Sequence, residues 1–263
     1  MTEAAIESAD RDRRRRPSGD PPPLPNEINR AAAAWLIAFL FWALIWGWIF
    51  LSDQPAIWIT RWDLRVVDAV AELRTAWLDP VMEWVNGFGT HWATVIIGWT
   101  ALIGALWARR IRHAVLLLAA LSITAATVNV VASWIMRPRP LGVEILGDWE
   151  GFAQPSRPVA LTAAAVVGCT LTLVPTRGRR VAYLGALVGL TLFGFAQAYT
   201  AVEHPTDTLA GATVGIAVTL VLFRVFAPES VFPITYRRAR TAHLELSDER
   251  AAAIRRGLRR QLD

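Results

Sequence analysis

The chain of 263 residues is 54% hydrophobic and 19% charged, and it contains one cysteine and thirteen tryptophans. This apolar content excludes a disordered chain, and a single cysteine excludes a disulfide-stabilised scaffold. A formal net charge of +5 would ordinarily favour a nucleic-acid partner. All 27 basic residues are arginines that lie between long apolar runs, however. We therefore expect a membrane protein with no nucleic-acid partner.

The N-terminal region, residues 1–29, combines the basic run Arg13–Arg16 with Pro21–Pro23, which predicts a disordered cytoplasmic tail. Residues 30–228 form the predicted membrane domain. Its first apolar run, Ala31–Leu51, is too long for the apolar part of a signal peptide and lacks a small-residue cleavage site. We expect it to be an uncleaved membrane anchor.

Six apolar segments meet or approach the roughly 20 residues that a helix needs to cross a bilayer. They are Ala31–Leu51, Trp92–Trp107, Ala114–Met136, Val159–Val174, Val181–Val202 and Thr208–Ala227. The second and fourth are short, but their alternation with four longer runs favours membrane helices over soluble core helices. The sequence therefore predicts an all-α, six-helix membrane bundle.

The orientation follows from the arginines of the short connections, because cytoplasmic loops carry an excess of positive charge. Clusters within 13–16, 109–112, 177–180 and 237–240 all fall on one side of a six-span arrangement. This predicts a multi-pass protein of the inner (plasma) membrane with both termini cytoplasmic. The segments 52–91, 137–158 and 203–207 then face outward.

The C-terminal region, residues 229–263, is predicted to form a second cytoplasmic tail. Ser247 could cap a helix running to about Leu262, with Ile254 and Leu258 on one face beside several arginines. Such a helix could lie on the anionic lipids of the inner leaflet, as could the basic N-terminal tail. A solvated basic helix is an equally good interpretation.

Three polar patches stand at the outward ends of the last four predicted helices. They are Arg137–Pro140, Gln154–Pro158 and Glu203–Asp207. Pro158 and Pro205 suit the first turn of a helix, so helices are expected to begin there. Helix N-termini favour anions, and arginine can bind two phosphate oxygens at once. Arg137, Arg139 and Arg157 are therefore predicted to converge in an anion cradle. The alternative is unspecific contact with lipid headgroups at ordinary helix ends.

The order and spacing of these patches resemble those of the type 2 phosphatidic acid phosphatase superfamily. Its integral membrane members have six spans and three motifs at the outer ends of the last four. The matching residues here are Arg137-Pro138-Arg139-Pro140, Pro155-Ser156 and Pro205-Thr206-Asp207-Thr208-Leu209-Ala210-Gly211. The likeness covers about residues 55 to 225, including Trp77–Met82 within the amphipathic stretch Trp62–Gly89. The resemblance implies a membrane lipid phosphatase fold.

The resemblance also implies a mechanism, from which this sequence departs. Family members use a histidine nucleophile oriented by an aspartate, a second histidine that protonates the leaving group, and Lys, Ser and Arg residues that hold the phosphate. Here Val130 stands in place of the lysine, and Pro158 replaces the acid histidine. Glu203 occupies the nucleophile's position, and His204 comes one residue late. The usual phosphohistidine mechanism therefore cannot be transferred unchanged.

The other departures concern the residues that bind phosphate. Ala196-Gln197 stand where the third motif has Ser-Arg, and Arg157 replaces the glycine of the second motif. The candidate catalytic residues are Glu203, His204 and Asp207; the candidate phosphate-binding residues are Arg137, Arg139, Ser156, Arg157 and Gln197. No metal or other cofactor is expected, because the family uses none and His204 with Asp207 provides too few ligands.

Three functions are compatible with this pattern. In a rebuilt enzyme, Arg139 and Arg157 would replace the missing cations, and Glu203 or His204 would attack an isoprenoid or glycerolipid (di)phosphate at the extracytoplasmic face. That protein would be a lipid-phosphate phosphatase or phosphotransferase, the preferred interpretation. Alternatively, a degenerate pocket would bind lipid phosphate without turnover, or serve a membrane protein partner as a subunit. In the third, the fold is structural and Glu203 pairs with Arg139 or Arg157. A transporter is less favoured, because no ionisable residue stands at mid-depth in a predicted span.

Overall fold

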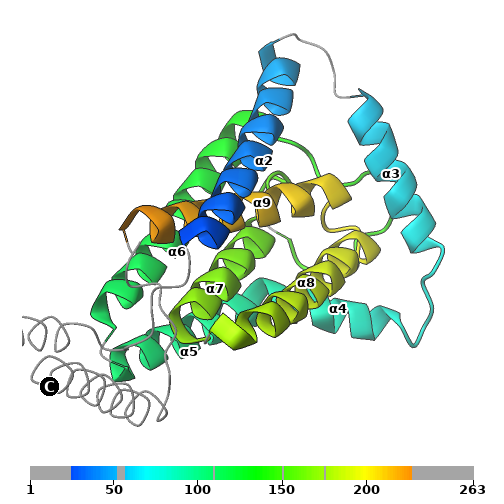
Figure 1. Cartoon of the computed structure of the whole chain (residues 1–263). Coiled ribbons are helices and arrows are strands. Elements are labelled where there is room, and N and C mark those ends of the chain that lie inside the picture. Colours follow the sequence, from blue (N-terminus) through cyan, green and yellow to red (C-terminus); the bar gives the residue numbers. More distant parts are fainter. Residues whose placement is uncertain (1–24, 52–56, 109, 150, 175, 227–263) are drawn as a thin grey trace, which may run out of the picture.

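The computed structural model describes residues 25–51, 57–108, 110–149, 151–174 and 176–226, and within these ranges the chain is helical with no strand (Figure 1). The residues 1–24 of the predicted N-terminal tail and the whole predicted helix from Ser247 to Leu262 lie outside the described ranges. The first described helix begins at Pro25, a few residues before the predicted start of the membrane domain.

Eight α-helices and one π-helical turn make up the described fold. They are α2 (Pro25–Leu51), α3 (Ile57–Ala71), α4 (Asp79–Phe88), η1 (Gly89–Ala93), α5 (Thr94–Trp107), α6 (Ile111–Ile135), α7 (Arg157–Leu173), α8 (Thr176–Tyr199) and α9 (Pro205–Phe226). Five helical stretches are long and apolar enough to cross a membrane, and α7 is a shorter apolar helix of 17 residues. The predicted six-helix membrane bundle is thereby confirmed.

The second membrane helix starts earlier than predicted. It was expected over Trp92–Trp107, whereas α4, η1 and α5 form one continuous helix, Asp79–Trp107. Its first half contains the polar residues Glu83, Asn86 and His91, so a search for continuous apolar runs does not detect it. Asn86 is buried against other protein segments, so its polar side chain is not exposed to lipid.

The long segment expected to be an outward loop, 52–91, is largely helical, because it contains α3, α4 and the start of η1. α8 begins at Thr176, before the predicted Val181, and ends at Tyr199. The η1 turn passes close to α8 at Gly89, where a Cβ atom would lie 2.2 Å from the Phe193 ring. A larger residue at this crossing would have to displace the Phe193 ring.

α7 lies at the centre of the bundle and packs against α5, α6, α8 and α9 (Figure 1). Its buried face consists of small residues, among them Ala160, Ala163 and Ala164. Gly215 of α9 faces this surface so closely that a Cβ atom would lie 2.1 Å from the Ala160 carbonyl oxygen. Small residues allow membrane helices to approach backbone to backbone. This central position explains why α7 can be shorter than its neighbours.

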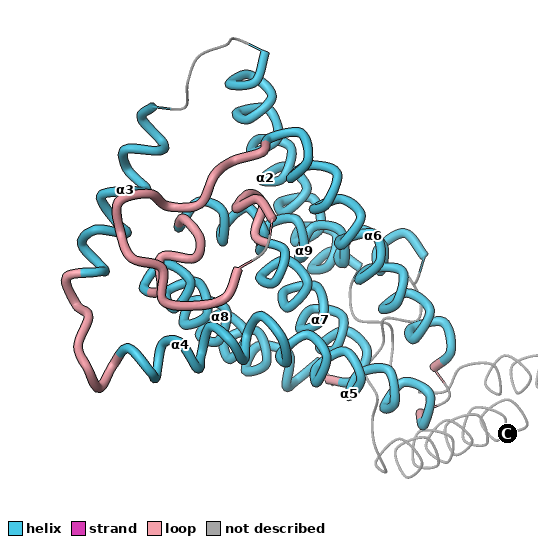
Figure 2. Tube along the Cα trace, turned by 180° about the vertical axis from the view of Figure 1, so that it is seen from behind, coloured by secondary structure: helices cyan, strands magenta, loops and turns pink. Residues whose placement is uncertain are grey.

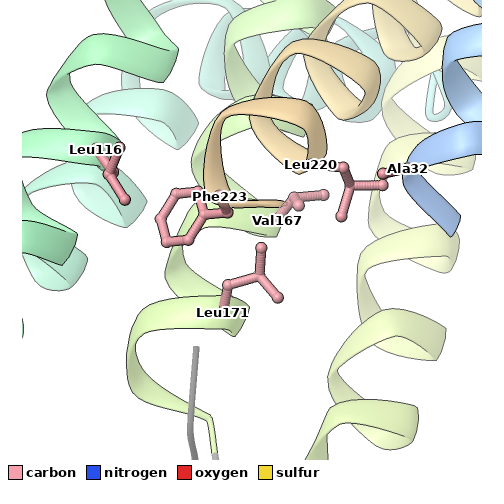
Figure 3. Close-up of a cluster of buried hydrophobic side chains, with 6 residues drawn as sticks. All are labelled: Ala32, Leu116, Val167, Leu171, Leu220 and Phe223. Carbon is pink, nitrogen blue, oxygen red and sulfur yellow. The ribbon is translucent and has the colours of Figure 1, made fainter. Parts of the chain in front are cut away.

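A hydrophobic cluster closes the bundle at the end of α7 opposite its N-terminus (Figure 3). Its buried members are Ala32, Leu116, Val167, Leu171, Leu220 and Phe223, which come from α2, α6, α7 and α9. The outer faces of the helices are apolar as well. On α2 alone, Ile37, Leu40, Phe41, Leu44 and Trp48 are exposed, as expected for side chains that meet lipid.

The polar residues gather at the other end of the bundle. The long connection between α6 and α7 lies there beside α3 (Figure 2), and Leu146 N donates to the Thr200 carbonyl oxygen at 2.9 Å. α9 begins at the same end with Pro205, as the sequence predicts. The three polar patches are therefore brought to one end of the bundle.

Candidate functional site

Arg137 is the centre of the polar site. α6 ends at Ile135, and Met136 adopts a left-handed conformation with φ of 46° that turns the chain sharply inward. The next residue, Arg137, is only 6% exposed. Its carbonyl oxygen accepts a hydrogen bond from Ala153 N at 3.0 Å, which fixes the two ends of the α6–α7 connection together. The guanidinium group consequently lies within the protein and away from lipid.

The two terminal nitrogens of Arg137 are bound to carboxylates of the protein itself. Nη1 lies 2.5 Å from Asp207 Oδ1, and it also donates to Thr206 Oγ1 at 2.8 Å. Nη2 lies 2.6 Å from Asp63 Oδ2. Both carboxylates are fully buried. The Arg137 guanidinium group, which was predicted to bind a phosphate, binds two aspartates.

Asp63 comes from α3 and also caps α9. Its Oδ1 accepts a hydrogen bond from Thr206 N at 3.1 Å, and its Oδ2 accepts one from Thr206 Oγ1 at 2.5 Å. Free amide groups in the first turn of a helix attract an anion. The sequence predicted an anion here, and the anion in the structure is the Asp63 side chain. Asp63 was not among the predicted site residues.

Asp207 links the start of α9 to His204. Its Oδ2 accepts from the backbone N of His204 at 3.2 Å and lies 2.9 Å from His204 Nδ1. The resemblance implied that the aspartate orients the residue at position 203. In the structure, Asp207 instead orients His204, one position later. Within the described residues, no hydrogen bond involves His204 Nε2.

Trp46 and Gln154 complete the surroundings of Arg137. The amide oxygen of Gln154 accepts a hydrogen bond from Trp46 Nε1 at 2.6 Å, and its nitrogen donates to Asp207 Oδ1 at 3.2 Å. The Trp46 ring also lies under the guanidinium group, 5.4 Å from ring centroid to the Arg137 carbon. α2 therefore contributes to the site, which sequence analysis missed.

The Gln154 side chain thus contacts Asp207 directly, with 3.2 Å between the amide nitrogen and Oδ1. Gln154 belongs to the α6–α7 connection and is fully buried. The amide is one more group of the protein that occupies the surroundings of the predicted anion cradle.

Ser156 has a structural role in the described site. It is the N-cap of α7, and its Oγ accepts a hydrogen bond from Val159 N at 3.4 Å. Its own backbone N donates to the Asp207 carbonyl oxygen at 3.0 Å. Gly211 lies directly beneath, where a Cβ atom would come within 2.3 Å of the Ser156 carbonyl oxygen. The starts of α7 and α9 are thereby held together.

Glu203 pairs with Arg139 and is almost fully buried. Glu203 Oε1 lies 3.5 Å from Arg139 Nη1, which also donates to the Val202 carbonyl oxygen at 2.7 Å. The Arg139 guanidinium lies over the Trp149 ring, 5.5 Å from its centroid. Glu203 itself is 2% exposed. The pairing of Glu203 with Arg139 is the one that the structural interpretation of the sequence anticipated.

Burial raises the pKa of Glu203 to about 8, and the nearby Asp207 charge acts in the same direction. Ser156 and Arg139 oppose this rise. Within the described residues, Glu203 Oε2 and both polar side-chain atoms of Gln197 have no hydrogen-bond partner. A buried carboxyl group with an unpaired oxygen is expected to be neutral. Glu203 is therefore mostly protonated at neutral pH.

Gln197 is connected to this region through its backbone. Its carbonyl oxygen accepts from Val202 N at 3.0 Å and from Glu203 N at 3.3 Å, where the chain turns from α8 toward α9. The side chain was a candidate for phosphate binding, and it is fully buried. Its position helps to shape the turn that carries Glu203 and His204.

The structure does not bring Arg157 to the other two arginines of the predicted cradle. Arg157 is exposed at the first position of α7. The reason is the helix start itself, because Ser156 caps α7 and is fully buried while the next side chain points outward. The cradle therefore contains two arginines.

The balance of charge in the cluster does not favour a phosphate group. Arg137 and Arg139 provide two positive charges, which Asp63 and Asp207 offset when Glu203 is protonated. A phosphate monoester carries about −1.5 to −2 charges near neutral pH. Within the described residues, no group of three His, Cys, Asp or Glu side chains could hold a metal ion. As described, the site is a neutral and mostly self-satisfied network.

The fold is similar to that of a membrane phosphatase of known structure. A transmembrane PAP2-type phosphatidylglycerolphosphate phosphatase from Bacillus subtilis superposes with a TM-score of 0.57 at 20% sequence identity, over 73% of this chain and 94% of that chain. LpxE from Aquifex aeolicus gives a TM-score of 0.49 at 18% identity, over 61% of this chain and 93% of that chain. No protein-family model and no curated protein sequence matches the chain.

The comparison with the Bacillus subtilis structure confirms, at the level of the fold, the resemblance that the three motifs indicated. Over its described residues the chain is an all-helical membrane protein whose fold is similar to that of this PAP2-type phosphatase. At 20% identity the likeness concerns the fold alone. What the polar site does must be inferred from its own geometry.

Proposed function

We propose that this chain is a non-hydrolytic protein of the lipid phosphatase fold, acting in the membrane as a lipid-binding protein or as a subunit of a larger complex. The observation that carries the proposal is the 2.6 Å ion pair between Arg137 Nη2 and Asp63 Oδ2, in which both side chains are buried. Asp63 takes the place of the anion for which the arginine and the start of α9 are suited.

The replacement of the usual catalytic groups supports the same conclusion. Pro158 cannot donate a proton to a leaving group, and Val130 provides no positive charge. Ser156 caps α7, and Arg157 is exposed. Phosphoryl transfer depends mainly on positioned positive charge. Because the charges of this cluster already cancel, it has little net positive charge with which to stabilise a phosphoryl group.

The orientation belongs to the same proposal. The polar site lies at the end of the bundle opposite the connection between α7 and α8, where several arginines lie. Positively charged connections favour the cytoplasmic side. We therefore place the polar site at the extracytoplasmic face of the inner membrane, with both ends of the membrane domain toward the cytoplasm.

The experiment that tests the proposal compares the parent protein with Asp63→Asn, in purified form in detergent. Phosphate release is measured from phosphatidic acid and from an isoprenoid diphosphate, and orthovanadate binding is measured by calorimetry. We expect neither release nor vanadate binding by the parent. Asp63→Asn should gain vanadate binding, because Arg137 and the start of α9 lose their internal anion.

The matched control is Asp68→Asn, an exposed aspartate on the same helix, which removes the same charge without touching Arg137. It should behave as the parent does. Release of phosphate by the parent above a buffer blank would contradict the non-hydrolytic proposal. Vanadate binding by the parent that Asp63→Asn does not increase would contradict the role given to Asp63.

A second candidate function, lipid-phosphate hydrolysis or transfer, is favoured by one specific contact. Asp207 Oδ2 lies 2.9 Å from His204 Nδ1, which leaves Nε2 as the nitrogen that could attack phosphorus. Glu203, protonated at neutral pH because its pKa is about 8, could give its proton to the departing oxygen. Water would then cleave the phosphorus–nitrogen bond and release phosphate. Substrates would be isoprenoid or glycerolipid (di)phosphates, with Arg139 and a freed Arg137 as the clamp.

The stability of a phosphorylated intermediate distinguishes the two possible nucleophiles. A phosphohistidine on His204 would be acid-labile and lost in His204→Gln, whereas an acyl phosphate on Glu203 would be labile to hydroxylamine and lost in Glu203→Gln. If the enzyme is active, Arg139→Ala should reduce phosphate release at least about tenfold, since a charge-assisted hydrogen bond contributes about 1.5–3 kcal/mol. Release that survives loss of both nucleophile candidates would exclude this mechanism.

A further inference from the structure

A large apolar groove runs along α8, between this helix and α7, α9, α2 and α3. Its volume is about 1090 Å³. It starts below the polar site, at Ala198 and Pro205, and it ends at Arg179 and Arg180 near the N-terminus of α8. Apart from these two arginines, the described lining consists of uncharged and mainly apolar residues. The groove is separate from the Arg137 cluster.

The length of the groove matches the thickness of a bilayer. At 1.5 Å per residue, α8 rises about 28 Å between Arg179 and Ala198, close to the roughly 30 Å of the hydrocarbon core. Figure 1 shows α8 running alongside α7 over much of this distance. The acyl chains of one lipid span about half of this core, so a lipid held at one end of the groove would fill the half next to its headgroup. The lining of the groove is mainly apolar, and flexible hydrocarbon chains can fill such an irregular space.

The arginines define the polar end of the occupant. Arg179 is 8% exposed, and its Nε donates to the Val174 carbonyl oxygen at 3.3 Å, which holds the side chain beside the end of α7. Arg180 is exposed next to it, and Tyr183 follows one turn later. No acidic residue is among the described residues that line the groove. Positive charge above an apolar groove complements a lipid with an anionic headgroup.

We propose that this groove binds an anionic glycerophospholipid, with its phosphate at Arg179 and Arg180 and its acyl chains along α8 and α9. The lipid would come from the leaflet next to the N-terminus of α8, at the opposite end of the bundle from Arg137. This inference does not depend on the chemistry of the Arg137 cluster. Failure of the lipid site would therefore leave the proposed function unchanged, and the reverse also holds.

The experiment measures retained lipid by native mass spectrometry, together with the melting temperature. The purified full chain is exchanged into detergent that contains dioleoylphosphatidylglycerol or dioleoylphosphatidylcholine. We expect the anionic lipid to be retained at least about fivefold better, from roughly 1 kcal/mol for each arginine close to an anionic headgroup. The double variant Arg179→Gln, Arg180→Gln should bring the two lipids to within about twofold of each other.

The apolar part is tested by Ala186→Trp, which fills the groove from α8, and by Leu184→Trp as its matched control. Leu184 is on the same helix and is exposed outside the groove. Ala186→Trp should lose retention of both lipids while Leu184→Trp retains them as the parent does. Inorganic phosphate alone should leave the melting temperature unchanged, since it lacks the chains.

Three results would overturn the lipid site. The first is equal retention of the two lipids by the parent, and the second is an unchanged preference in the double arginine variant. The third is a rise in melting temperature with inorganic phosphate as large as that with the anionic lipid. The double arginine variant keeps the test decisive even if the tryptophan at Ala186 prevents folding, because it leaves the apolar lining of the groove unchanged.

Discussion

Asp63 and Arg137 are 74 positions apart in the chain, yet their side chains form a buried ion pair of 2.6 Å at the start of α9. The pair joins α3 to the end of α6, and Thr206 connects both residues to α9. An arginine that is suited to an external phosphate therefore has an internal carboxylate as its partner.

We expect Asp63→Asn to destabilise the protein by about 3–5 kcal/mol, because removing one partner of a buried ion pair leaves an uncompensated charge. The remaining Asp207 carboxylate should place the loss at the lower end of that range. Denaturation in detergent, followed by circular dichroism, measures the change. Asp68→Asn on the exposed side of α3 should shift stability by less than about 0.5 kcal/mol. Equal effects of the two substitutions would contradict a special role for Asp63.

The raised pKa of Glu203 makes stability depend on pH. The folded protein holds a proton on Glu203 up to about pH 8, whereas the unfolded chain releases it near the ordinary value of 4.5. Stability should therefore be greatest at low pH and fall as the pH rises from about 4.5 to 8. The slope has an upper limit of about 1.4 kcal/mol per pH unit for one proton.

Glu203→Gln provides the test of that pH dependence, because glutamine keeps the shape of the protonated carboxyl group and does not titrate. We expect the melting temperature to change less between pH 5 and 8 for Glu203→Gln than for the parent. At pH 8 the variant should be the more stable of the two. A variant whose pH dependence equals that of the parent would show that another group dominates this range.

The contact between α7 and α9 should be sensitive to a single methyl group. A Cβ atom at Gly211 would lie 2.3 Å from the Ser156 carbonyl oxygen, and one at Gly215 would lie 2.1 Å from that of Ala160. Since both obstacles are backbone atoms, the helices must separate, and we expect Gly211→Ala and Gly215→Ala each to cost at least about 1–3 kcal/mol. Gly185→Ala is the control, because nothing lies within 4 Å of its added atom. Thermal unfolding of the three variants gives the comparison.

Tyr199 anchors the early start of the second membrane helix. Its hydroxyl donates to Asp79 Oδ1 at 2.6 Å and accepts from Thr75 N at 3.3 Å, and its ring is fully buried. Tyr199→Phe should cost about 1–3 kcal/mol, because the hydrogen bonds of the Tyr199 hydroxyl with Asp79 and Thr75 are lost. Hydrogen exchange should also increase around residues 75–82. Tyr183→Phe, a change on a more exposed tyrosine of the same helix, should leave exchange there unaltered.

Much of the fold could be predicted from sequence because it rests on local signals. The apolar runs indicated the membrane helices, and Pro205 marked the first residue of α9. Pro158 likewise falls in the first turn of α7. The start of the second helix at Asp79 was missed, since its polar residues are satisfied by distant parts of the chain, as the Tyr199 contact with Asp79 shows. Apolar length does not report such tertiary contacts.

The candidate site, like the fold, could be predicted from the sequence only in part. Arg137, Asp207 and His204 were identified from the motifs, and the structure brings them together. Asp63 could not be identified, because one aspartate in an amphipathic helix looks like a solvated residue until α3 is placed against α9. Arg157 was expected in the cluster because of its charge and its place in the second motif at a helix start, whereas the capped start of α7 leaves its side chain exposed.

The order of the helices along the chain gives Asp63 a further consequence, during synthesis. Arg137 emerges from the ribosome long before Thr206 and Asp207, which follow only after α8. Asp63 precedes all of them, so a carboxylate partner for Arg137 is already available when α6 enters the bilayer. A half-inserted bundle can therefore pair this arginine with Asp63 before the last helix adds Thr206 and Asp207.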